Sequence, residues 1–435
     1  MQFYSTNHIS QNAGLREAVL TGLAPDGGLY LPERIPTIPR AFFRNIPEMS
    51  LREIAFVVAD LMLGEEIDSA TIKRIVYDTF TFDVPLTELS PEIYALELFH
   101  GPTLAFKDVG ARFLARVIAH FTGGRPGDDP MKVVVATSGD SGGAVASGFF
   151  GVTGVEVYVL YPKGRLSEVQ RRQFLELEGN IHPIEVSGTF DQCQRLTREL
   201  LSDKEAREKA HITTANSLNI CRLLPQTFYF FYAYARMMAH NAEGGDPVIA
   251  IPCGNLGNLT AGLMAMEMGL PVKRLVAATN ANDAVLKFLA TGEFKPFTPV
   301  ATAAKAMDVA TPANMARIAE LCHGDFAKLS EKVEGVAASD LDIVTTIRDL
   351  YERYHYLCDP HGATACHGLM KALRPGERGI FLSTAHPSKF PDTIFEATGL
   401  RLPTHRSNAK QRHFQPPTRI APTLSALTRV MLDKT

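Results

Sequence analysis

Short continuous apolar runs alternate with segments of helical periodicity over most of this chain. Runs such as 133–136 and 248–251 contain no polar residue, as buried strands of a parallel sheet do. Segments such as 259–268 lie between runs of this kind and are typical of helices. This repeated alternation predicts an α/β fold whose parallel sheets are covered by helices on both faces. The first ~95 residues are more mixed, with helical spacing over 50–80.

Lys107 follows an apolar run and stands at the predicted start of a helix. The segment His100–Asp108 (HGPTLAFKD) precedes apolar positions at 109, 113, 114, 117 and 118, which form one helical face. A lysine in water has a pKa of about 10.4. Apolar neighbours and the positive end of a helix both disfavour the charged form. We therefore predict a neutral amine at Lys107, as a Schiff base with an aldehyde cofactor such as pyridoxal phosphate requires.

A glycine-containing loop lies between the predicted strand that ends at Ile251 and a helix predicted to start near Leu259. Its backbone N–H groups and the helix N-terminus predict a cradle for a phosphate group. No Gly-Lys-Ser/Thr follows, and the glycine spacing differs from the dinucleotide fingerprint. A simple tight turn is the alternative. The loop consists of Gly254, Asn255, Leu256, Gly257 and Asn258.

A second loop, Thr137–Gly143, also lies between a strand and a predicted helix, here one that starts at Ala144. Its hydroxyl and N–H groups could hold a carboxylate or a phosphate. The string Gly-Asp-Ser-Gly-Gly also surrounds the nucleophile of chymotrypsin-like serine proteases, so a serine hydrolase acting through Ser141 is an alternative. Those proteases are β-barrels, usually secreted and disulfide-linked, whereas this motif opens a helix in an α/β context.

A cluster of metal-binding residue types occurs near the C-terminal third. The cluster consists of Cys358, His361, Cys366 and His367, and its spacing fits no standard zinc pattern. We therefore expect no metal. Asp359–Gly362 is more typical of a turn that opens a helix.

The composition excludes several classes of partner. The net charge of −3 gives no general reason to expect a nucleic acid. No run of about 18 apolar residues is present, so we expect no membrane span. The N-terminal residues predict no secretory signal, and six scattered cysteines favour reduced thiols in the cytoplasm. The tail from 401 carries seven Lys or Arg residues against one acid, and we expect it to be solvated and partly docked.

Several of these segments, in this order, resemble the threonine synthase family, and in particular its subgroup with a long N-terminal region. The segments are Gly22–Tyr30, His100–Asp108, Ala136–Ala146, Ala215–Arg222, Gly254–Gly262, Ala278–Asp283 and Ser383–Phe390. The resemblance implies the tryptophan-synthase-β fold of pyridoxal-phosphate enzymes (fold type II), with two parallel-sheet α/β domains. It implies an N-terminal region (1–95), a large cofactor-binding domain (96–130 and 245–400), a smaller domain (131–244) and a basic tail (401–435).

The resemblance also implies roles for individual residues. Lys107 would hold pyridoxal phosphate as a Schiff base and then transfer protons, and Thr384 would bond to the pyridine nitrogen. Residues 254–258 would cradle the cofactor phosphate. Substrate would be bound by Ser138, Asp140, Ser141, Asn216, Ser217 and Arg222, of which the last three would meet its phosphate. An arginine suits that position because its planar fork pairs with phosphate oxygens.

The activity implied is the conversion of O-phospho-L-homoserine and water to L-threonine and phosphate, by a monomer or homodimer. A related phospholyase that releases 2-oxobutyrate is the alternative of the same fold. The chain departs from the family pattern at three positions. Ser141 stands where threonine is more common, and Leu256 and Asn258 replace phenylalanine and aspartate. We expect the backbone contacts of the loop to persist, and the loss of an acid beside a phosphate should not weaken binding.

Overall fold

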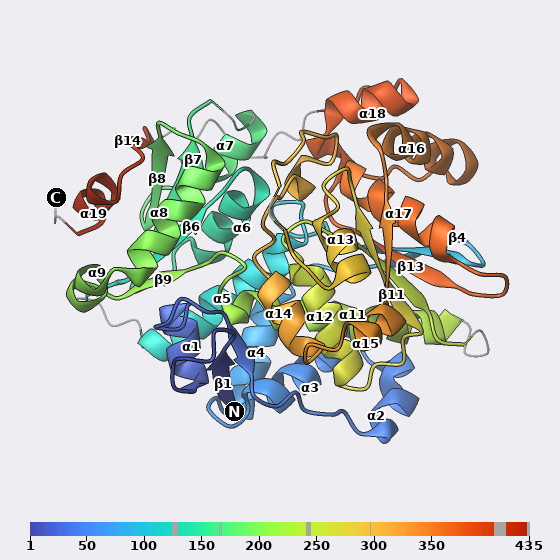
Figure 1. The fold of residues 1–435 in the computed structure, drawn as a ribbon, viewed down its shortest axis with the longest axis horizontal. Coiled ribbons are helices and arrows are strands. Elements are labelled where there is room, and N and C mark those ends of the chain that lie inside the picture. The colour runs from blue at the N-terminus through green and yellow to red at the C-terminus, as the bar shows by residue number, and fades with distance from the viewer. Residues whose placement is uncertain are drawn as a thin grey trace.

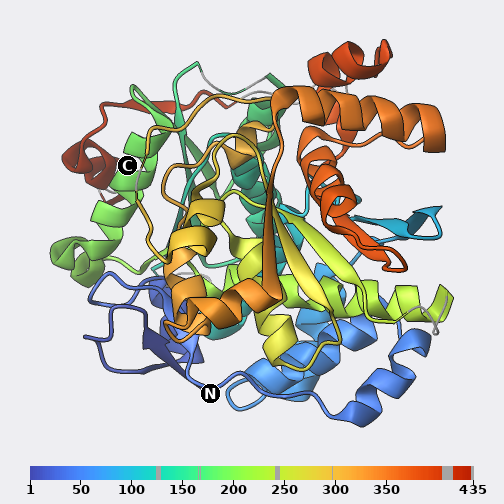
Figure 2. The ribbon, with the colours of Figure 1, turned by 45° about the vertical axis from the view of Figure 1, so that its right-hand side comes forward.

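The computed structural model of the 435-residue chain describes all residues except 124–128, 165, 167, 241–244, 296, 404–414 and 433–435. Two largely parallel sheets lie side by side, and an N-terminal region lies beneath both of them (Figures 1 and 2). The α/β fold predicted from the alternating runs is confirmed.

The larger sheet has six strands in the order β12-β11-β10-β13-β5-β4, and only β4 runs antiparallel to its neighbour. Alternate residues of a strand face opposite sides: Ile249 and Ile251 join one hydrophobic cluster, whereas Val248 and Ala250 join another. A strand buried on both faces needs no polar residue, which explains the apolar runs. The strands are β4 (Leu86–Ser90), β5 (Ile93–Glu97), β10 (Val248–Pro252), β11 (Arg274–Thr279), β12 (Val333–Ala337) and β13 (Gly379–Ser383).

Helices cover both faces of this sheet. On one face, α17 packs against the strands, α16 covers α17, and α18 contacts α16. On the other face, α12 packs against the strands and α11 packs against α12. Pro225 lies between α10 and α11, as expected of a residue that disfavours the interior of a helix. The helices are α5 (Lys107–Thr122), α10 (Ile220–Leu223), α11 (Gln226–His240), α12 (Gly257–Glu267), α13 (Ala284–Thr291), α14 (Met315–Leu321), α15 (Phe326–Lys332), α16 (Asp340–Tyr354), α17 (Pro360–Ala372) and α18 (Pro391–Thr398), with short 3-10 helices η3 (Lys305–Met307) and η4 (Pro387–Lys389).

The smaller sheet is fully parallel, with the order β14-β8-β7-β6-β9. Helices α8 and α19 cover one face, and α6 lies on the other, where it packs against α5. The strands are β6 (Met131–Ala136), β7 (Val155–Pro162), β8 (Ile181–Val186), β9 (Ile212–Thr214) and β14 (Thr418–Ile420), and the helices are α6 (Asp140–Phe149), α7 (Glu168–Leu175), α8 (Phe190–Ser202), α9 (Lys204–Lys209) and α19 (Leu424–Leu432).

Part of the basic tail is docked on this smaller sheet. Strand β14 pairs with β8, and Arg419 Nε lies 3.1 Å from Glu185 Oε1. The remaining parts of the tail, 404–414 and 433–435, lie outside the described residues.

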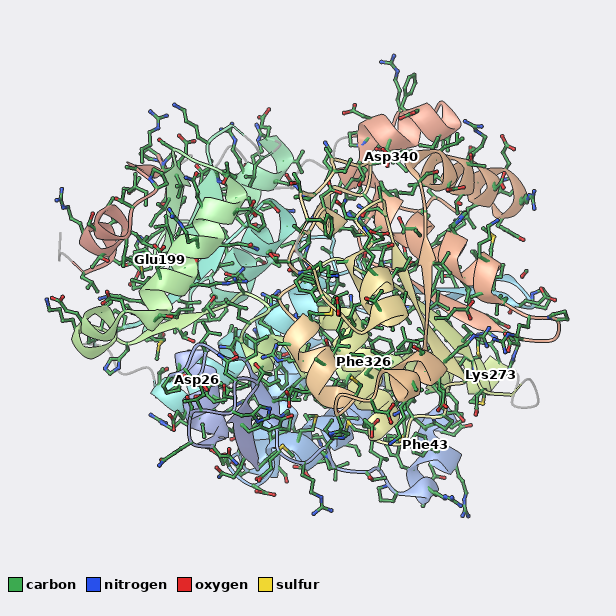
Figure 3. All side chains as sticks on the ribbon, in the orientation of Figure 1. Asp26, Phe43, Glu199, Lys273, Phe326 and Asp340 are labelled. Atoms are coloured by element: carbon green, nitrogen blue, oxygen red, sulfur yellow. The ribbon has the colours of Figure 1, made fainter. Side chains whose placement is uncertain are left out.

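The N-terminal region forms a three-stranded antiparallel sheet, four α-helices and one short 3-10 helix. Helix α3 packs against α11, and α4 packs against α5. Asp26, labelled in Figure 3, organises the turn at 24–28: its carboxylate accepts hydrogen bonds from Ser5 Oγ (2.6 Å) and from Gly28 N (2.9 Å). The elements are β1 (Gln2–Ser5), β2 (Ala13–Gly14), β3 (Tyr30–Pro32), α1 (Leu15–Thr21), α2 (Arg40–Asn45), η1 (Ile46–Glu48), α3 (Leu51–Leu63) and α4 (Ser69–Thr79).

Within the described part of the chain, no helix has the length and apolar character needed to cross a membrane.

Candidate active site

Lys107 lies beside the carboxyl end of β13 in the larger sheet. The segment before it pairs with the segment after β13: Phe106 N donates to Thr384 O at 2.9 Å, and His386 N donates to Leu104 O at 3.0 Å. Leu104 adopts a left-handed φ of 58°, and α5 begins three residues later at Lys107. The pairing therefore brings the lysine and Thr384 together, although they are far apart in the sequence.

Lys107 is partly buried as a residue, and the pKa of its amine lies below the ordinary value of 10.5. Removal from water is the largest cause. The positive charges of Lys389 and Arg222 lower the pKa further, whereas Asp140 opposes the shift. The direction agrees with the prediction from the sequence, and the structure adds two cations that the sequence analysis did not connect with this lysine.

The predicted phosphate loop joins β10 to α12. The helix begins at Gly257, two residues earlier than expected, so Gly257 and Asn258 form its first turn. Leu256 caps the helix in a left-handed conformation (φ 61°). The first N–H groups of a helix have no acceptor within it, and they attract an anion. A Cβ built on Gly254 would lie 2.8 Å from Ala306 O, so this position requires glycine.

Two side chains and one backbone carbonyl of this loop bond to their surroundings within the protein. Asn255 Oδ1 accepts from Ala313 N at 3.4 Å, and Asn255 O accepts from Asn314 Nδ2 at 2.8 Å. Tyr229 Oη donates to Asn258 Oδ1. These contacts use oxygen atoms of the loop and fix its position. The backbone N–H groups of the loop are therefore the groups available to a phosphate.

Thr384 is 5 % exposed and follows directly after β13. Strand β13 is the neighbour of β10 in the sheet, so Thr384 and the phosphate loop leave adjacent strands at their carboxyl ends. Ligand sites of parallel α/β sheets usually form at this edge.

The loop after β6 belongs to the smaller sheet. Thr137 Oγ1 accepts hydrogen bonds from Gly139 N (3.0 Å) and Gly142 N (2.9 Å) and so fixes the turn. Helix α6 begins at Asp140, not at Ala144 as predicted. Because of this earlier start, Asp140 and Ser141 lie in the first helical turn, whereas Ser138 is exposed in the loop.

Asp140 pairs with a residue that the sequence analysis did not single out. Lys389 Nζ lies 2.8 Å from Asp140 Oδ1 and also donates to Thr103 O at 2.8 Å. Burial alone would raise the pKa of Asp140, but Lys389 and Lys107 outweigh it and hold the pKa well below its usual range. In the sequence, the only indication of this contact is that Lys389 lies within the family-like segment Ser383–Phe390.

Two of the predicted substrate-binding residues have side-chain or backbone contacts within the protein. Asn216 Nδ2 donates to Ala136 O (2.8 Å), and Asn216 Oδ1 accepts from Ala136 N (3.0 Å). This double contact anchors the residue immediately before the Thr137 loop. Ser217 O accepts from the buried Arg317 Nη1 at 3.0 Å. The structure thus gives Asn216 a positioning contact at the site.

Arg222 is a buried cation with unused donors. It is 6 % exposed, and its Nε and Nη1 have no hydrogen-bond partner among the residues that the structure describes. A Cβ built on Gly110 would lie 3.1 Å from Nε, so the guanidinium packs on α5 one turn after Lys107. Burial lowers the pKa of Arg222 to about 10, against the opposing charge of Asp108. A buried, unpaired guanidinium is costly unless an anion joins it.

The residues present fit pyridoxal phosphate. The site offers an amine with a lowered pKa, a helix N-terminus preceded by a loop in which Gly254 is required, and a buried hydroxyl residue directly after the adjacent strand. Lys107, the loop at 254–258 and Thr384 would hold the cofactor, and Arg222 would offer a separate place for a second anion.

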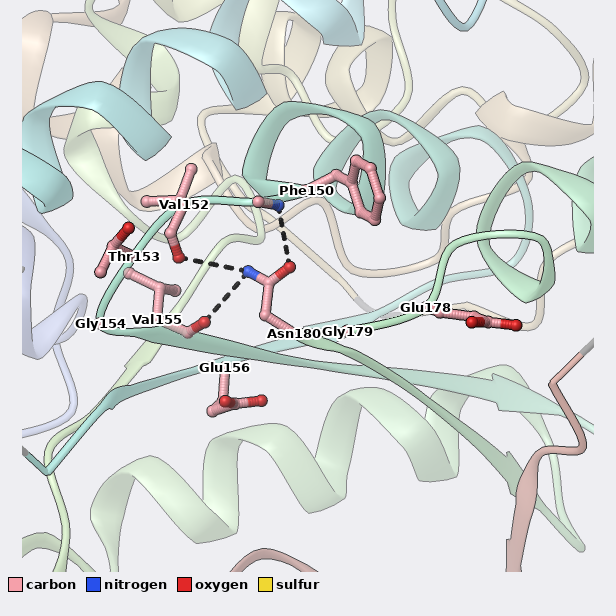
Figure 4. A pocket seen from close by; sticks show the side chains of 10 residues that line it. Phe150, Val152, Thr153, Gly154, Val155, Glu156, Glu178, Gly179 and Asn180 are labelled. Atoms are coloured by element: carbon pink, nitrogen blue, oxygen red, sulfur yellow. Dashed lines mark hydrogen bonds between the residues drawn. The ribbon is translucent and has the colours of Figure 1, made fainter. Parts of the chain in front are cut away.

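A surface hollow of about 420 Å³ lies elsewhere, near the amino ends of β7 and β8 (Figure 4). Asn180, one of the residues that line it, donates to Val155 O (3.0 Å) and accepts from Gly151 N (3.0 Å). The loop at Thr137 follows the carboxyl end of β6, so the hollow is at the opposite end of the smaller sheet from the candidate site.

Comparisons with known proteins identify the family of the chain. Residues 78–384 match the family described as pyridoxal-phosphate dependent enzyme, residues 2–80 match the threonine synthase N terminus, and residues 361–428 match the threonine synthase C-terminal family. Threonine synthase from Haemophilus influenzae is 41% identical over 93% of this chain and 92% of that protein. The crystal structure of threonine synthase from Escherichia coli has a TM-score of 0.91 at 35% identity and covers 100% of both chains. PLP-bound threonine synthase from Brucella melitensis has a TM-score of 0.89 at 30% identity and covers 99% of both.

Proposed function

The chain belongs to the threonine synthase family of pyridoxal-phosphate-dependent enzymes, and we propose that it converts O-phospho-L-homoserine and water to L-threonine and phosphate through Lys107. The family match supports a pyridoxal-phosphate lyase and not the serine hydrolase considered for Ser141.

The observation that carries the substrate assignment is the position of Arg222. Its Nε, one of two donors without a partner among the described residues, packs against Gly110, one helical turn along α5 from Lys107. The loop at 254–258 can hold one phosphate, and Arg222 can hold another. A substrate that carries its own phosphate satisfies this second cation, and O-phospho-L-homoserine has that group.

The side chains of this site supply binding and proton transfer. When bound, pyridoxal phosphate supplies an electron sink for the negative charge left on the substrate carbon. The Nζ of Lys107, whose pKa is lowered, is assigned to take the proton from Cα and, in turn, one from Cβ. Arg222 holds the phosphate as it departs from Cγ with the electron pair of the C–O bond. The two protons go to Cγ and to the departing phosphate, and water adds its hydroxyl group to Cβ and its proton to Cα, which completes threonine. Thr384 is assigned to the ring nitrogen and residues 254–258 to the cofactor phosphate.

Ser138, Asp140 and Ser141 are assigned to the amino-acid end of the substrate. Ser138 is exposed in the loop, and Asp140 is held in place by Lys389. A rigid carboxylate at this position fixes the orientation of the loop before substrate arrives. The hydroxyl groups of Ser138 and Ser141 and the N–H groups at the N-terminus of α6 then offer hydrogen-bond donors to a carboxylate.

The variant Lys107→Ala tests the assignment. We expect it to lose both the absorbance band of the covalently attached cofactor and the formation of threonine from O-phospho-L-homoserine. Lys305→Ala, at an exposed lysine, is the control and should retain both. Normal turnover by Lys107→Ala would overturn the proposal. Product analysis separates threonine from 2-oxobutyrate, so predominant release of 2-oxobutyrate would favour the phospholyase alternative.

We also propose a reducing compartment, the cytoplasm, as the place of action. The six cysteines all fall among the described residues, and each is a buried free thiol. Free thiols of this kind are typical of proteins from reducing compartments.

A further inference from the structure

Asp359 and His361 form a buried pair at the start of α17. Asp359 is fully buried and His361 is 5 % exposed. The Asp359 carboxylate caps the helix by accepting from His361 N (3.0 Å) and Gly362 N (3.3 Å). In addition, His361 Nδ1 lies 2.8 Å from Asp359 Oδ1. Helix capping is thus one role of the Asp359 carboxylate. It gives no role to the second nitrogen of the imidazole ring, Nε2.

Each member of the pair also bonds to a separate segment. His361 Nε2 accepts a hydrogen bond from Ala306 N at 3.3 Å. Asp359 Oδ2 accepts one from Ala385 N at 3.4 Å. Because Nε2 is an acceptor, the ring proton must lie on Nδ1 and point to the carboxylate. The imidazole is therefore neutral and fixed in one tautomer by its two partners.

These two segments border the two ends of the proposed cofactor site. The carbonyl of Ala306 faces Gly254, where an added Cβ would lie 2.8 Å away. Ala385 follows Thr384, the residue assigned to the ring nitrogen. The pair thus connects the wall behind the phosphate loop with the end of β13.

The loop that carries Ala306 is anchored at other points as well. Asp308 Oδ1 accepts from Asn280 Nδ2 at 2.8 Å, and Asp308 Oδ2 accepts from Thr302 N at 3.1 Å. Asp340, labelled near α18 in Figure 3, accepts from Ala303 N at 3.0 Å. These bonds hold the residues before and after Ala306. Within the described part of the chain, His361 is the side chain that bonds to Ala306 itself.

We propose that Asp359 and His361 form a positioning pair that sets the spacing between the phosphate loop at Gly254 and the ring-nitrogen end at Thr384. This inference rests on the proposed function, because the two segments are assigned to the cofactor there. A flat, rigid cofactor requires both ends of its site at a fixed separation, so a loose Ala306 lowers its affinity. The pair acts through the backbone of Ala306 and Ala385 and does not itself touch the cofactor.

Two substitutions of His361 separate positioning from simple packing. The amide of Asn reaches the place of Nδ1 and preserves the bond to Asp359, whereas the amide of Gln reaches the place of Nε2 and preserves an acceptor for Ala306. Both remove the ring and its edge-on contact with Phe390 (centroids 5.1 Å apart). Loss of the ring contact with Phe390 is therefore common to both variants. Gln keeps one methylene more than Asn, and the melting temperatures of the cofactor-free variants report any effect of that difference in packing.

The measurement is the dissociation constant of pyridoxal phosphate, titrated into cofactor-free protein by absorbance, with the melting temperature of the cofactor-free form in parallel. We expect His361→Asn to bind the cofactor about tenfold more weakly than His361→Gln. His367→Asn, on the same helix but half-exposed, should match the unmodified protein.

Equal affinity in the two His361 variants overturns the inference, whether or not both melt at a lower temperature. In that case the unmodified protein still binds the cofactor and the proposed function stands. If the unmodified cofactor-free protein fails to bind pyridoxal phosphate, the proposed function fails, and the inference fails with it.

Discussion

Lys389 Nζ lies 2.8 Å from Asp140 Oδ1, and their side chains are only 4% and 7% exposed. Lys389 follows β13 of the larger sheet, whereas Asp140 follows β6 of the smaller one. The ion pair therefore joins the carboxyl ends of the two sheets at the point where Lys107 lies. A buried pair of this kind fixes geometry, because neither partner can be removed without leaving a buried charge alone.

Lys389→Met and Asp140→Asn should move the pKa of Lys107 in opposite directions. The first removes a positive charge that lowers this pKa, so the pKa should rise; the second removes a negative charge that raises it, so the pKa should fall. The pH dependence of the rate at which cofactor-free protein takes up pyridoxal phosphate reports the fraction of neutral amine. Lys305→Met, at an exposed lysine, should leave the profile unchanged. Shifts of the same sign in the two variants would contradict this account.

Arg222→Met should abolish the second anion site without harming the fold. We expect binding of inorganic phosphate and of O-phospho-L-homoserine to weaken by about tenfold or more, because a charge-assisted contact is lost. Stability should be unchanged or increased, since the guanidinium has buried donors without partners in the described chain. Phosphate inhibition constants and melting temperatures measure the two effects. Unaltered phosphate binding would show that Arg222 does not form the second anion site.

Arg317→Met should have the opposite effect on stability. Arg317 is fully buried, yet its donors are used: Nε bonds to Tyr30 O (3.0 Å), Nη2 to Leu218 O (2.7 Å) and Nη1 to Asn314 Oδ1 (2.7 Å). It therefore links the N-terminal region to the site. The loss of several bonds to buried oxygens should cost roughly 3 kcal/mol or more in the free energy of unfolding. Urea denaturation measures this, with exposed Arg429→Met as the control. A loss no greater than that of the control would show that the link is dispensable.

Glu377→Gln should reveal a pH-dependent contribution to stability. Hydrogen bonds from Arg274, with Nη2 to Oε2 at 2.7 Å, hold the pKa of Glu377 well below its usual 4.5. A depressed pKa contributes stability that is complete above the unfolded value and is lost as the pH falls towards the folded value. The free energy of unfolding of the unmodified protein should thus be higher than that of Glu377→Gln by roughly 3 kcal/mol at pH 7. This difference should shrink below about pH 4.5, the usual value for Glu.

Unfolding free energies measured from pH 7 to pH 3.5 test this dependence. Glu334→Gln is the matched control, because Glu334 also pairs with Arg274 but is 39% exposed. Its effect should stay within about 1 kcal/mol. A difference for Glu377→Gln that stays constant down to pH 3.5 would contradict the assigned pKa direction.

Local patterns predicted most of the elements around the site but misplaced two helix starts. Both α6 and α12 begin earlier than the apolar periodicity indicated, at Asp140 and Gly257. Glycine and polar residues disfavour a helix in isolation. Here the packing of the following turns against the sheets stabilises the helix, so its first turn extends into the loop motif. The N–H groups that we propose to bind the ligand consequently belong to the helix.

The sequence by itself determined the alternation of strands and helices, the resemblance to the family and the lysine at the start of α5. These features are local, because they depend on periodicity and on short strings of residues. Only the tertiary structure decided that Lys389 meets Asp140, that Arg222 packs against Gly110 with two donors left without a partner in the described part of the chain, and that His361 bonds to Ala306. Such contacts join residues that are remote in the chain. Their existence depends on which strand ends the folded sheets bring together, and no single segment contains that information.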